Sequence, residues 1–396
     1  MIHVGIDLSK SSLMLCTSNA TQPPRKWPTV KISYDQPDWY RALLTLVQPG
    51  AVVVFEPTGW HYARPVITAL AAHDCSLWQV PTNATGHIRD IHISPGKSDR
   101  TDAQALALAA TWIAAGHHIP GAYPHHNELE DAVTELRLLI NAHARAIRSR
   151  TRLLNQIDQL GFSLWPALVQ KKEIWLRAAR VGAITPAQVK ALAADPCLMD
   201  YEAYQHGNAR NALKALAEML PAVDGPPATV QNIRDLLTKI DALTDEAHAI
   251  SQRTTDIVSA DPFQEVTERW RTIPYAVPKQ SDPPGNLFGL ATLHVACRGR
   301  AQDFARDEFK KALGAHPKTR QSGDAVRRDR IKAGYRPAMT TLYTWAMVLV
   351  KPNAQPNPIR DYFQTTATQY RMQATVRKLA HVLWGVARDP AGYHYP

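Results

Sequence analysis

The chain has 396 residues, and its 45 Lys and Arg against 35 Asp and Glu give a formal net charge of +10 at pH 7. This length allows two or three domains with real cores, and the basic balance favours a polyanionic partner. The four cysteines are far apart, which indicates free thiols in a reducing compartment rather than a zinc site or a disulfide framework. No apolar stretch is long enough to span a membrane and no signal peptide precedes the first strand-like run, so we expect a soluble, cytoplasmic protein with no membrane partner.

The N-terminal part, residues 1–125, reads as an α/β domain. Its expected elements, in chain order, are strands at 3–8, 12–16 and 29–34, a helix at about 36–48, a strand at 51–56, a helix at 60–73, a strand at 76–80 and an Ala-rich helix at 99–115. The first two strands are close enough in sequence to pair antiparallel, and the apolar run at 51–56 is typical of a buried parallel strand. Three strands, a helix and then strand–helix alternation is the order of a ribonuclease-H-like (RuvC-like) domain.

Four acidic residues occupy positions in this domain where acids are informative. Asp7 ends the first strand and Glu56 ends the buried one, where a carboxylate is costly unless it is paired or binds a cation. Asp99 and Asp102 are three residues apart in a first helical turn and share a face. Each acid alone has an ordinary interpretation as a turn, strand-end or solvated helix acid. Together they predict a convergent set of oxygen donors, which suits Mg²⁺ or Mn²⁺ and phosphoryl-transfer chemistry rather than zinc.

A sugar kinase is the competing interpretation of the first strand. Actin-like kinases also begin with Gly-Ile-Asp, but a Gly-Thr phosphate loop follows there, whereas Leu8-Ser9-Lys10 follows here. The chain also has no P-loop, so the kinase interpretation is disfavoured.

The middle part, residues 126–261, is expected to be helical. Apolar residues at 3–4 spacing predict one long helix at about 128–160 and another at 230–250, which could form an antiparallel coiled coil within the chain or between copies. The insertion at 161–226 is interrupted by prolines and is interpreted as a structural spacer. The first long helix is strongly basic, and its candidate contacts to nucleic-acid phosphates are Arg145, Arg148 and Arg152.

The C-terminal part, residues 262–396, contains a strongly basic segment with a serine. Twelve Lys and Arg stand against five acids between Arg298 and Arg336, and we expect a helix over 303–313 and another over 337–350. Ser322 is followed by glycine in an expected loop, usually a surface turn, although cations that neutralise a phosphate would also suit a nucleophilic hydroxyl. The candidate nucleic-acid contacts around it are Lys318, Arg320, Arg327, Arg328, Arg330 and Lys332.

The two ends of the chain together resemble a known family. The segments that carry the resemblance are Val4-Gly5-Ile6-Asp7-Leu8-Ser9-Lys10, Phe55-Glu56-Pro57-Thr58-Gly59, Lys97-Ser98-Asp99-Arg100-Thr101-Asp102-Ala103, the stretch from Phe304 to Arg336 with Gln321-Ser322-Gly323, and Arg377-Lys378-Leu379-Ala380. They are similar to the bacterial insertion-sequence transposases with an N-terminal DEDD (RuvC-like) domain and a C-terminal transposase domain bearing a serine, the bridge-RNA-guided recombinases.

This resemblance implies a function and a set of roles. It makes Asp7, Glu56, Asp99 and Asp102 the metal-binding DEDD set and Ser322 the nucleophile that forms a phosphoserine bond with a DNA strand. It also implies Mg²⁺ or Mn²⁺ as cofactor and donor DNA, target DNA and a non-coding guide (bridge) RNA as partners. The implied assembly is a homodimer or homotetramer whose active sites combine residues of different protomers. Guidance by base pairing would suit a basic chain that has no helix-turn-helix or zinc-finger reader.

The chain departs from the family pattern at several points. The segment 273–278 lacks the family's glycines, which puts a DNA contact by that hairpin in doubt, and Arg328 stands where the family often has glycine. Two alternatives to the recombinase stay open. One is a metal-dependent junction endonuclease in which Ser322 only contacts phosphate, and the other is a nucleic-acid-binding protein without catalysis.

Overall fold

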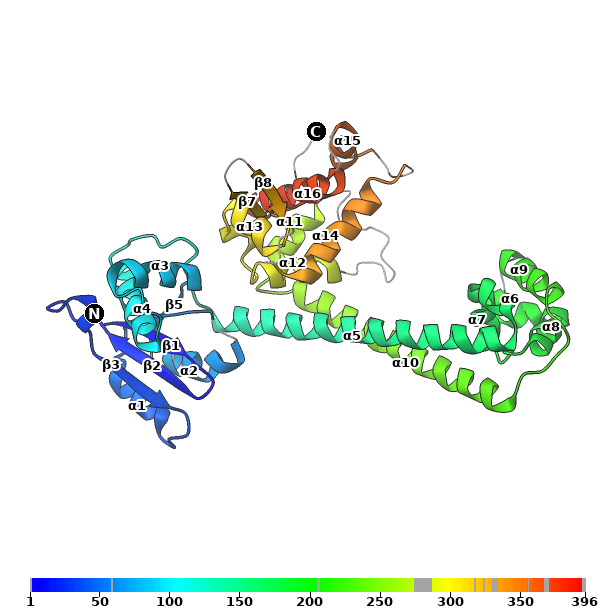
Figure 1. The fold of residues 1–396 in the computed structure, drawn as a ribbon, viewed down its shortest axis with the longest axis horizontal. Helices are drawn as coiled ribbons and strands as arrows, with labels where there is room; N and C mark the ends of the chain where they lie inside the picture. The colour runs from blue at the N-terminus through cyan, green and yellow to red at the C-terminus, as the bar shows by residue number, and fades with distance from the viewer. Residues whose placement is uncertain are drawn as a thin grey trace. The chain divides into compact units, whose positions relative to one another are not determined.

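The computed structural model describes the whole chain apart from a few short stretches, namely residues 1, 58–59, 205–206, 274–286, 317, 323–324, 330–333, 353, 355, 367–369 and 394–396. The chain forms two compact units. Unit 1 contains Met1–Leu136, Ile257–Pro278 and Gly289–Pro396, and unit 2 contains Arg137–Asp256 and Lys279–Phe288. Figure 1 shows their elements.

The N-terminal part of unit 1 is built on a six-stranded mixed sheet. Its strands are β1 (His3–Leu8), β2 (Ser12–Thr17), β3 (Thr29–Ser33), β4 (Val52–Phe55), β5 (Ser76–Gln79) and β6 (Tyr123–Pro124). Their order is β3-β2-β1-β4-β5-β6, with β4 and β5 parallel to β1 and the other pairs antiparallel. The carboxyl ends of β1, β4 and β5 therefore meet at one edge of the sheet.

Helices cover both faces of this sheet. They are α1 (Trp39–Leu46), α2 (Trp60–Ala72), α3 (Thr82–His92) and α4 (Asp99–Ala114), with the 3₁₀ turn η1 at Pro24–Lys26. Side chains of α1 and α2 share one apolar core with Val4, Ile6 and Leu8 of β1. Side chains of α3 and α4 form a second core with residues of the neighbouring strands, such as Cys16 and Val54. Side chains alternate along a strand, so Gly5 and Asp7 face the α3–α4 side.

Helix α4 lies unusually close to β1 because β1 has a glycine at the contact. A Cβ atom on Gly5 would lie 2.1 Å from the backbone nitrogen of Ala107 and 2.2 Å from the backbone oxygen of Ala103. Small residues on α4 complete this approach, since Ala103, Ala107 and Ala110 are all fully buried. The close packing brings the first turn of α4 towards the end of β1.

The C-terminal part of unit 1 is mostly helical. Its elements are α11 (Gln264–Arg271), α12 (Phe288–Ala296), η4 (Ala301–Asp303), α13 (Arg306–Ala312), β7 (Lys318–Ser322), β8 (Ala325–Asp329), α14 (Arg336–Leu349), α15 (Pro358–Thr365) and α16 (Arg371–Arg388). Its core includes the fully buried Trp270, whose indole N–H donates to the carbonyl of Leu383 on α16 at 2.8 Å. The strands β7 and β8 pair antiparallel.

Unit 2 is helical. It contains most of α5 (Asn127–Leu164) and of α10 (Pro227–Val258), together with α6 (Pro166–Gln170), α7 (Lys172–Arg180), α8 (Pro186–Ala194), η2 (Pro196–Asp200), η3 (Glu202–Tyr204) and α9 (Gly207–Glu218). The long helices α5 and α10 run in opposite directions side by side (Figure 1) and share one core, to which Ile157 and Ile233 contribute. Trp175 fills the centre of that core and donates from its indole N–H to the carbonyl of Ile184 at 2.9 Å.

These observations confirm the mixed α/β sheet with helices at the N-terminus and the mostly helical C-terminal part. The elements that were not predicted include α3, the short β6 and both strands of the hairpin of β7 and β8. The loop predicted around Ser322 is wrong for that residue, because Ser322 ends β7 in register with Ala325 of β8. The expected helix over 303–313 is shorter, since a 3₁₀ turn and an extended residue precede α13. Among the described residues, none of the helices has the length and apolarity needed to cross a membrane.

Candidate functional site

Asp7 is the centre of the candidate site in unit 1. It lies one residue before the end of β1, half-buried, on the face that α4 covers. Burial, together with the negative charges of Asp99, Asp102 and Glu56, raises the pKa of its carboxyl group to about 7, against the opposing charge of Lys97. The other three predicted acids therefore act electrostatically on Asp7, as like charges do when they share a site.

The first turn of α4 positions Asp99 and Asp102. Ser98 is the N-cap, and its hydroxyl accepts from the backbone N–H of Thr101 at 3.2 Å while its own N–H donates to the Thr101 hydroxyl at 2.9 Å. This reciprocal cap fixes where the helix begins. Asp99 is exposed, whereas Asp102 points into the protein and is 6% exposed. The two predicted acids of this motif thus have different environments.

A cation that the sequence interpretation missed holds Asp102. Arg89 on α3 donates from Nη1 to Oδ1 of Asp102 at 2.8 Å, and both side chains are largely buried, at 13% and 9% exposure. Arg89 also pairs with the more exposed Asp90. A buried carboxylate requires such a partner or a metal ion. Because α3 was not predicted, no sequence signal connected Arg89 with the acids.

Glu56 follows β4 directly and is half-buried. Its Oε2 accepts a hydrogen bond from the Thr82 hydroxyl at 3.0 Å, and Thr82 is the first residue of α3. Helix α3 therefore contacts two of the four acids, with Thr82 at its beginning and Arg89 in its last turn. The residues Pro57 and Thr58 continue the Glu-Pro-Thr-Gly motif, of which Thr58 and Gly59 lie outside the described residues.

The donor set suits a hard divalent cation by its chemistry. All four side chains offer carboxylate oxygens, which Mg²⁺ and Mn²⁺ prefer, and a cation would relieve the repulsion that disfavours ionised Asp7. Within the part of the chain that the structure describes, no three His, Cys, Asp or Glu side chains are close enough together to hold an ion. The carboxylates of Asp102 and Glu56 instead accept hydrogen bonds from Arg89 and Thr82.

Ser322 lies on the hairpin of β7 and β8. The register pairs Ser322 with Ala325 and Arg320 with Arg327. The side chains of this hairpin are not among those described, so the backbone alone places Lys318, Arg320, Ser322, Arg327 and Arg328. The predicted contacts Arg330 and Lys332 lie outside the described residues, as does the segment 274–278 of the glycine-poor hairpin.

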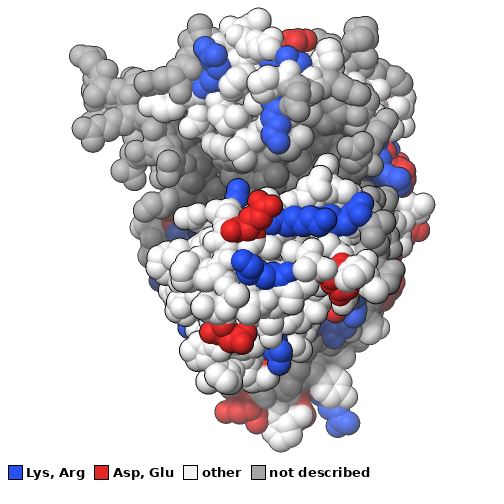
Figure 2. Space-filling view, turned by 90° about the vertical axis from the view of Figure 1, so that its right-hand side faces the viewer, with Lys and Arg blue, Asp and Glu red and all other residues white. Residues whose placement is uncertain are grey.

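The predicted phosphate contacts on α5 are available in unit 2. Arg145, Arg148 and Arg152 are exposed, and none forms an ion pair with another described residue. Their spacing of three and four residues places them along one side of the helix. The face that carries α6–α9 differs, because its Lys and Arg side chains lie among Asp and Glu side chains and form no continuous basic surface (Figure 2). Mixed charge of this kind is typical of a solvated surface.

Comparisons with known protein families match both ends of the chain. Residues 4–161 match a family of DEDD type described as a transposase. Residues 290–364 match a family described as the transposase IS116/IS110/IS902 family. No curated protein matches the chain. The first match contains all four acids, and the second contains Ser322.

Proposed function

We propose that the chain, a transposase of the IS110 family of insertion sequences, cuts and rejoins DNA strands under the guidance of an RNA. The chain has the matched transposase segments of both its N-terminal and its C-terminal part. In this proposal the N-terminal domain holds a divalent metal ion, Mg²⁺ or Mn²⁺, with Asp7, Glu56, Asp99 and Asp102. The C-terminal domain supplies Ser322 as the nucleophile.

The observation that carries the proposal is the electrostatic state of Asp7. A carboxyl group at the end of a core strand, with its pKa raised to about 7 by burial and three further acids, destabilises the fold when it is ionised. Such perturbed groups concentrate at functional sites. The order of three antiparallel strands followed by parallel β4 and β5, with helices on both faces, also supports a ribonuclease-H-like domain. In that arrangement the acids lie at the edge where the parallel strands end.

The chemistry divides between the two domains. When bound, the metal would stabilise charge on the phosphate and on the departing oxygen. The Oγ atom of Ser322 forms a bond to phosphorus, the bond from phosphorus to the 3′ oxygen breaks, the serine proton passes to a base, and the 3′ oxygen takes up a proton. Reversal of the same step with a different 3′ hydroxyl would rejoin strands and release the serine.

The proposed partners are nucleic acids and further copies of the chain. We place donor and target DNA, together with a guide RNA, against the exposed arginines of α5 and the basic hairpin of β7 and β8, where positive charges would contact phosphates. Because the acids and Ser322 belong to different domains, a dimer or tetramer could combine them between protomers. The protein would act in the cytoplasm, with domains at residues 1–125, 126–261 and 262–396.

The serine step is tested by trapping the covalent complex. Wild-type protein, Ser322→Ala and the matched control Thr319→Ala are incubated with Mg²⁺, the copurified RNA and radiolabelled donor and target DNA, then denatured. We expect a labelled protein band for the wild type and the control and none for Ser322→Ala, with RNA binding unchanged in all three. An equal adduct in Ser322→Ala would remove Ser322 from the mechanism. Cleavage that leaves free 5′ phosphate and 3′ hydroxyl ends with no protein attached would favour the junction endonuclease instead.

The RNA is tested by expression together with the non-coding DNA that flanks the element. One abundant copurified RNA from these flanks, with segments complementary to the element end and to its insertion site, is the expected result. Recovery of unrelated cellular RNA alone would contradict guidance and leave the acid chemistry standing.

A further inference from the structure

A second cluster of buried and half-buried polar groups lies in unit 1. We refer to it as the Gln79 cluster, and its members are Gln79, Tyr123, His125, Glu130 and Arg298. Gln79 ends β5 and pairs in register with Phe55 of β4, the residue before Glu56. Gln79, Tyr123 and His125 come from the N-terminal domain and Glu130 from the beginning of α5, whereas Arg298 follows α12 in the C-terminal domain. The cluster therefore connects the domain that carries the acids with the domain that carries the serine.

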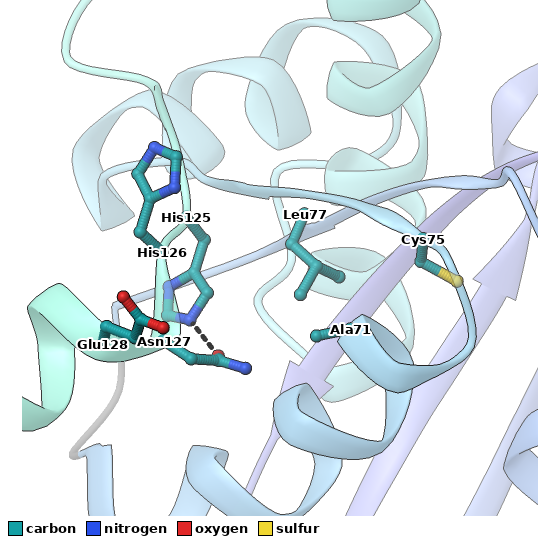
Figure 3. A pocket seen from close by; sticks show the side chains of 7 residues that line it. All are labelled: Ala71, Cys75, Leu77, His125, His126, Asn127 and Glu128. Atoms are coloured by element: carbon teal, nitrogen blue, oxygen red, sulfur yellow. Dashed lines mark hydrogen bonds between the residues drawn. The ribbon is translucent and has the colours of Figure 1, made fainter.

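The hydrogen bonds of the cluster define the orientation of each group. The Gln79 Oε1 atom accepts from the Tyr123 hydroxyl and from Nη1 of Arg298, the latter at 2.8 Å. The Gln79 Nε2 atom donates to Nδ1 of His125 at 2.8 Å and to Oε1 of Glu130 at 3.3 Å. His125 therefore accepts at Nδ1 and carries its proton on Nε2, which donates to Oδ1 of Asn127 at 2.8 Å (Figure 3). Burial lowers the pKa of His125 to about 4, so this neutral form persists at physiological pH.

The ring of His125 contacts both sides of the segment that carries Glu56. It packs edge-to-face against Phe55, with centroids 5.3 Å apart, and tilted against Trp60, with centroids 5.1 Å apart. Phe55 directly precedes Glu56, and Trp60 begins α2 four residues after Glu56. The indole N–H of Trp60 also donates to Asp131 on α5 at 2.6 Å. One histidine thus fixes the two ends of the short segment on which Glu56 lies.

Packing alone does not fix this histidine. His125 is 8% exposed and lines a pocket of about 400 Å³ together with His126, Asn127 and Glu128 (Figure 3), so space remains beside it. A ring with space beside it depends on its hydrogen bonds for its orientation. One of these bonds comes from Gln79, whose amide is in turn oriented by Arg298 and Tyr123.

The turn that presents Arg298 is held in an unusual backbone conformation. Arg298 has φ of 51° and Gly299 has φ of 68°, both in the left-handed region, which is costly for the arginine. A Cβ atom on Gly299 would lie 2.5 Å from the Leu129 side chain, so the turn lies tightly against the beginning of α5. Arg300 donates to the carbonyl of Pro124 at 2.6 Å, and its guanidinium lies 4.4 Å from the centre of the Tyr123 ring.

From this geometry we propose that Arg298 is a positioning residue, which sets the place of Glu56 through Gln79 and His125. The inference rests on the proposed function, because it concerns Glu56 as a metal ligand. Docking of the Arg298–Arg300 turn orders Gln79, Gln79 orients His125, and His125 holds the residues on both sides of Glu56. The acid site is then complete only when the serine-bearing domain is docked.

The test measures metal affinity without DNA. Full-length wild-type protein, Arg298→Gln, Arg298→Lys, Tyr123→Phe, the site variant Asp7→Asn and the control Arg306→Gln are titrated with Mn²⁺ by calorimetry, and their melting temperatures are measured in EDTA. Arg306 is about half exposed on α13 and has no contact with the Gln79 cluster in the described structure, so its variant controls for the lost charge. Removing groups that orient metal ligands commonly weakens metal affinity by roughly 10–100-fold, and we expect about tenfold for Arg298→Gln.

Further arms make the outcome decisive. Arg298→Lys keeps a cationic donor and should recover part of the affinity, which a general loss of stability would not do. Tyr123→Phe keeps the ring below Arg300 and removes only the hydroxyl, so it serves if Arg298→Gln fails to fold, and it should also weaken binding. Wild-type affinity in both Arg298→Gln and Tyr123→Phe would overturn the inference while the proposed metal site stands. A wild-type protein that binds no Mn²⁺, or binds it as Asp7→Asn does, would overturn the proposed metal site and this inference with it.

Discussion

Replacement of Asp7 by asparagine should stabilise the metal-free protein. A pKa raised from 3.8 to about 7 corresponds to roughly 4 kcal/mol at 1.36 kcal/mol per pKa unit, which is the free energy that the ionised carboxylate costs the folded state above pH 7. Because Asp7 is only partly buried, solvent screening reduces this to about 2 kcal/mol. Asparagine has nearly the same shape without the charge, so Asp7→Asn should gain about this amount in the free energy of unfolding.

Urea denaturation at pH 8 in EDTA, and again in Mg²⁺, measures the effect. The variant should be the more stable protein in EDTA, while Mg²⁺ should stabilise the wild type much more than the variant. The pH dependence supplies a second arm. An acid whose folded pKa is raised contributes stability that is present below its unfolded value of 3.8 and lost as the pH rises through about 7. The difference between the two proteins should therefore vanish near pH 4. A wild type that is at least as stable as Asp7→Asn at pH 8 in EDTA would refute the electrostatic account of the site.

Two further substitutions test how the site is held. Gly5→Ala places a Cβ atom about 2 Å from the backbone of α4 and should lower the free energy of unfolding, measured in urea, by about 3 kcal/mol. The control Ala42→Gly, at an exposed position of α1, should lower it by no more than about 1 kcal/mol. A Gly5→Ala protein of wild-type stability would show that α4 can move away freely. Arg89→Met leaves the buried Asp102 carboxylate unpaired and should lower the free energy of unfolding by about 3 kcal/mol in EDTA. Part of this loss should be recovered in Mg²⁺. Equal losses with and without Mg²⁺ would show that Asp102 does not bind the metal ion.

Much of the N-terminal domain could be predicted because its signals are local. Apolar strands such as Val52–Phe55 and the Ala-rich run of α4 have the composition that their elements require, and Ser98 with Thr101 marks the helix start. Helix α3 was not predicted because Thr82–His92 contains Thr, Asn, Gly and His, which favour helices weakly. Because α3 was not predicted, Thr82 and Arg89 could not be predicted as the partners of Glu56 and Asp102.

The hairpin of β7 and β8 was missed although its sequence contains a signal. Ser322 and Ala325 are separated by Gly-Asp, which is typical of a two-residue hairpin turn, but the many arginines favoured a surface loop. The prolines of the insertion were interpreted as breaks, whereas Pro166 and Pro186 begin helices, a position that suits their fixed φ. The Gln79 cluster could not have been predicted, because Gln79 and Arg298 are 219 residues apart and meet only in the folded unit.

Under the proposed function, the four acids and Ser322 act in one reaction. The most direct measurement is mass spectrometry of peptides after Mg²⁺-dependent reaction with donor and target DNA, followed by nuclease digestion, for wild-type protein and Asp7→Asn. We expect a nucleotide linked to Ser322 in the wild type with Mg²⁺, and none in EDTA or in Asp7→Asn. A nucleotide on a different residue, or on Ser322 to the same extent in Asp7→Asn, would contradict it.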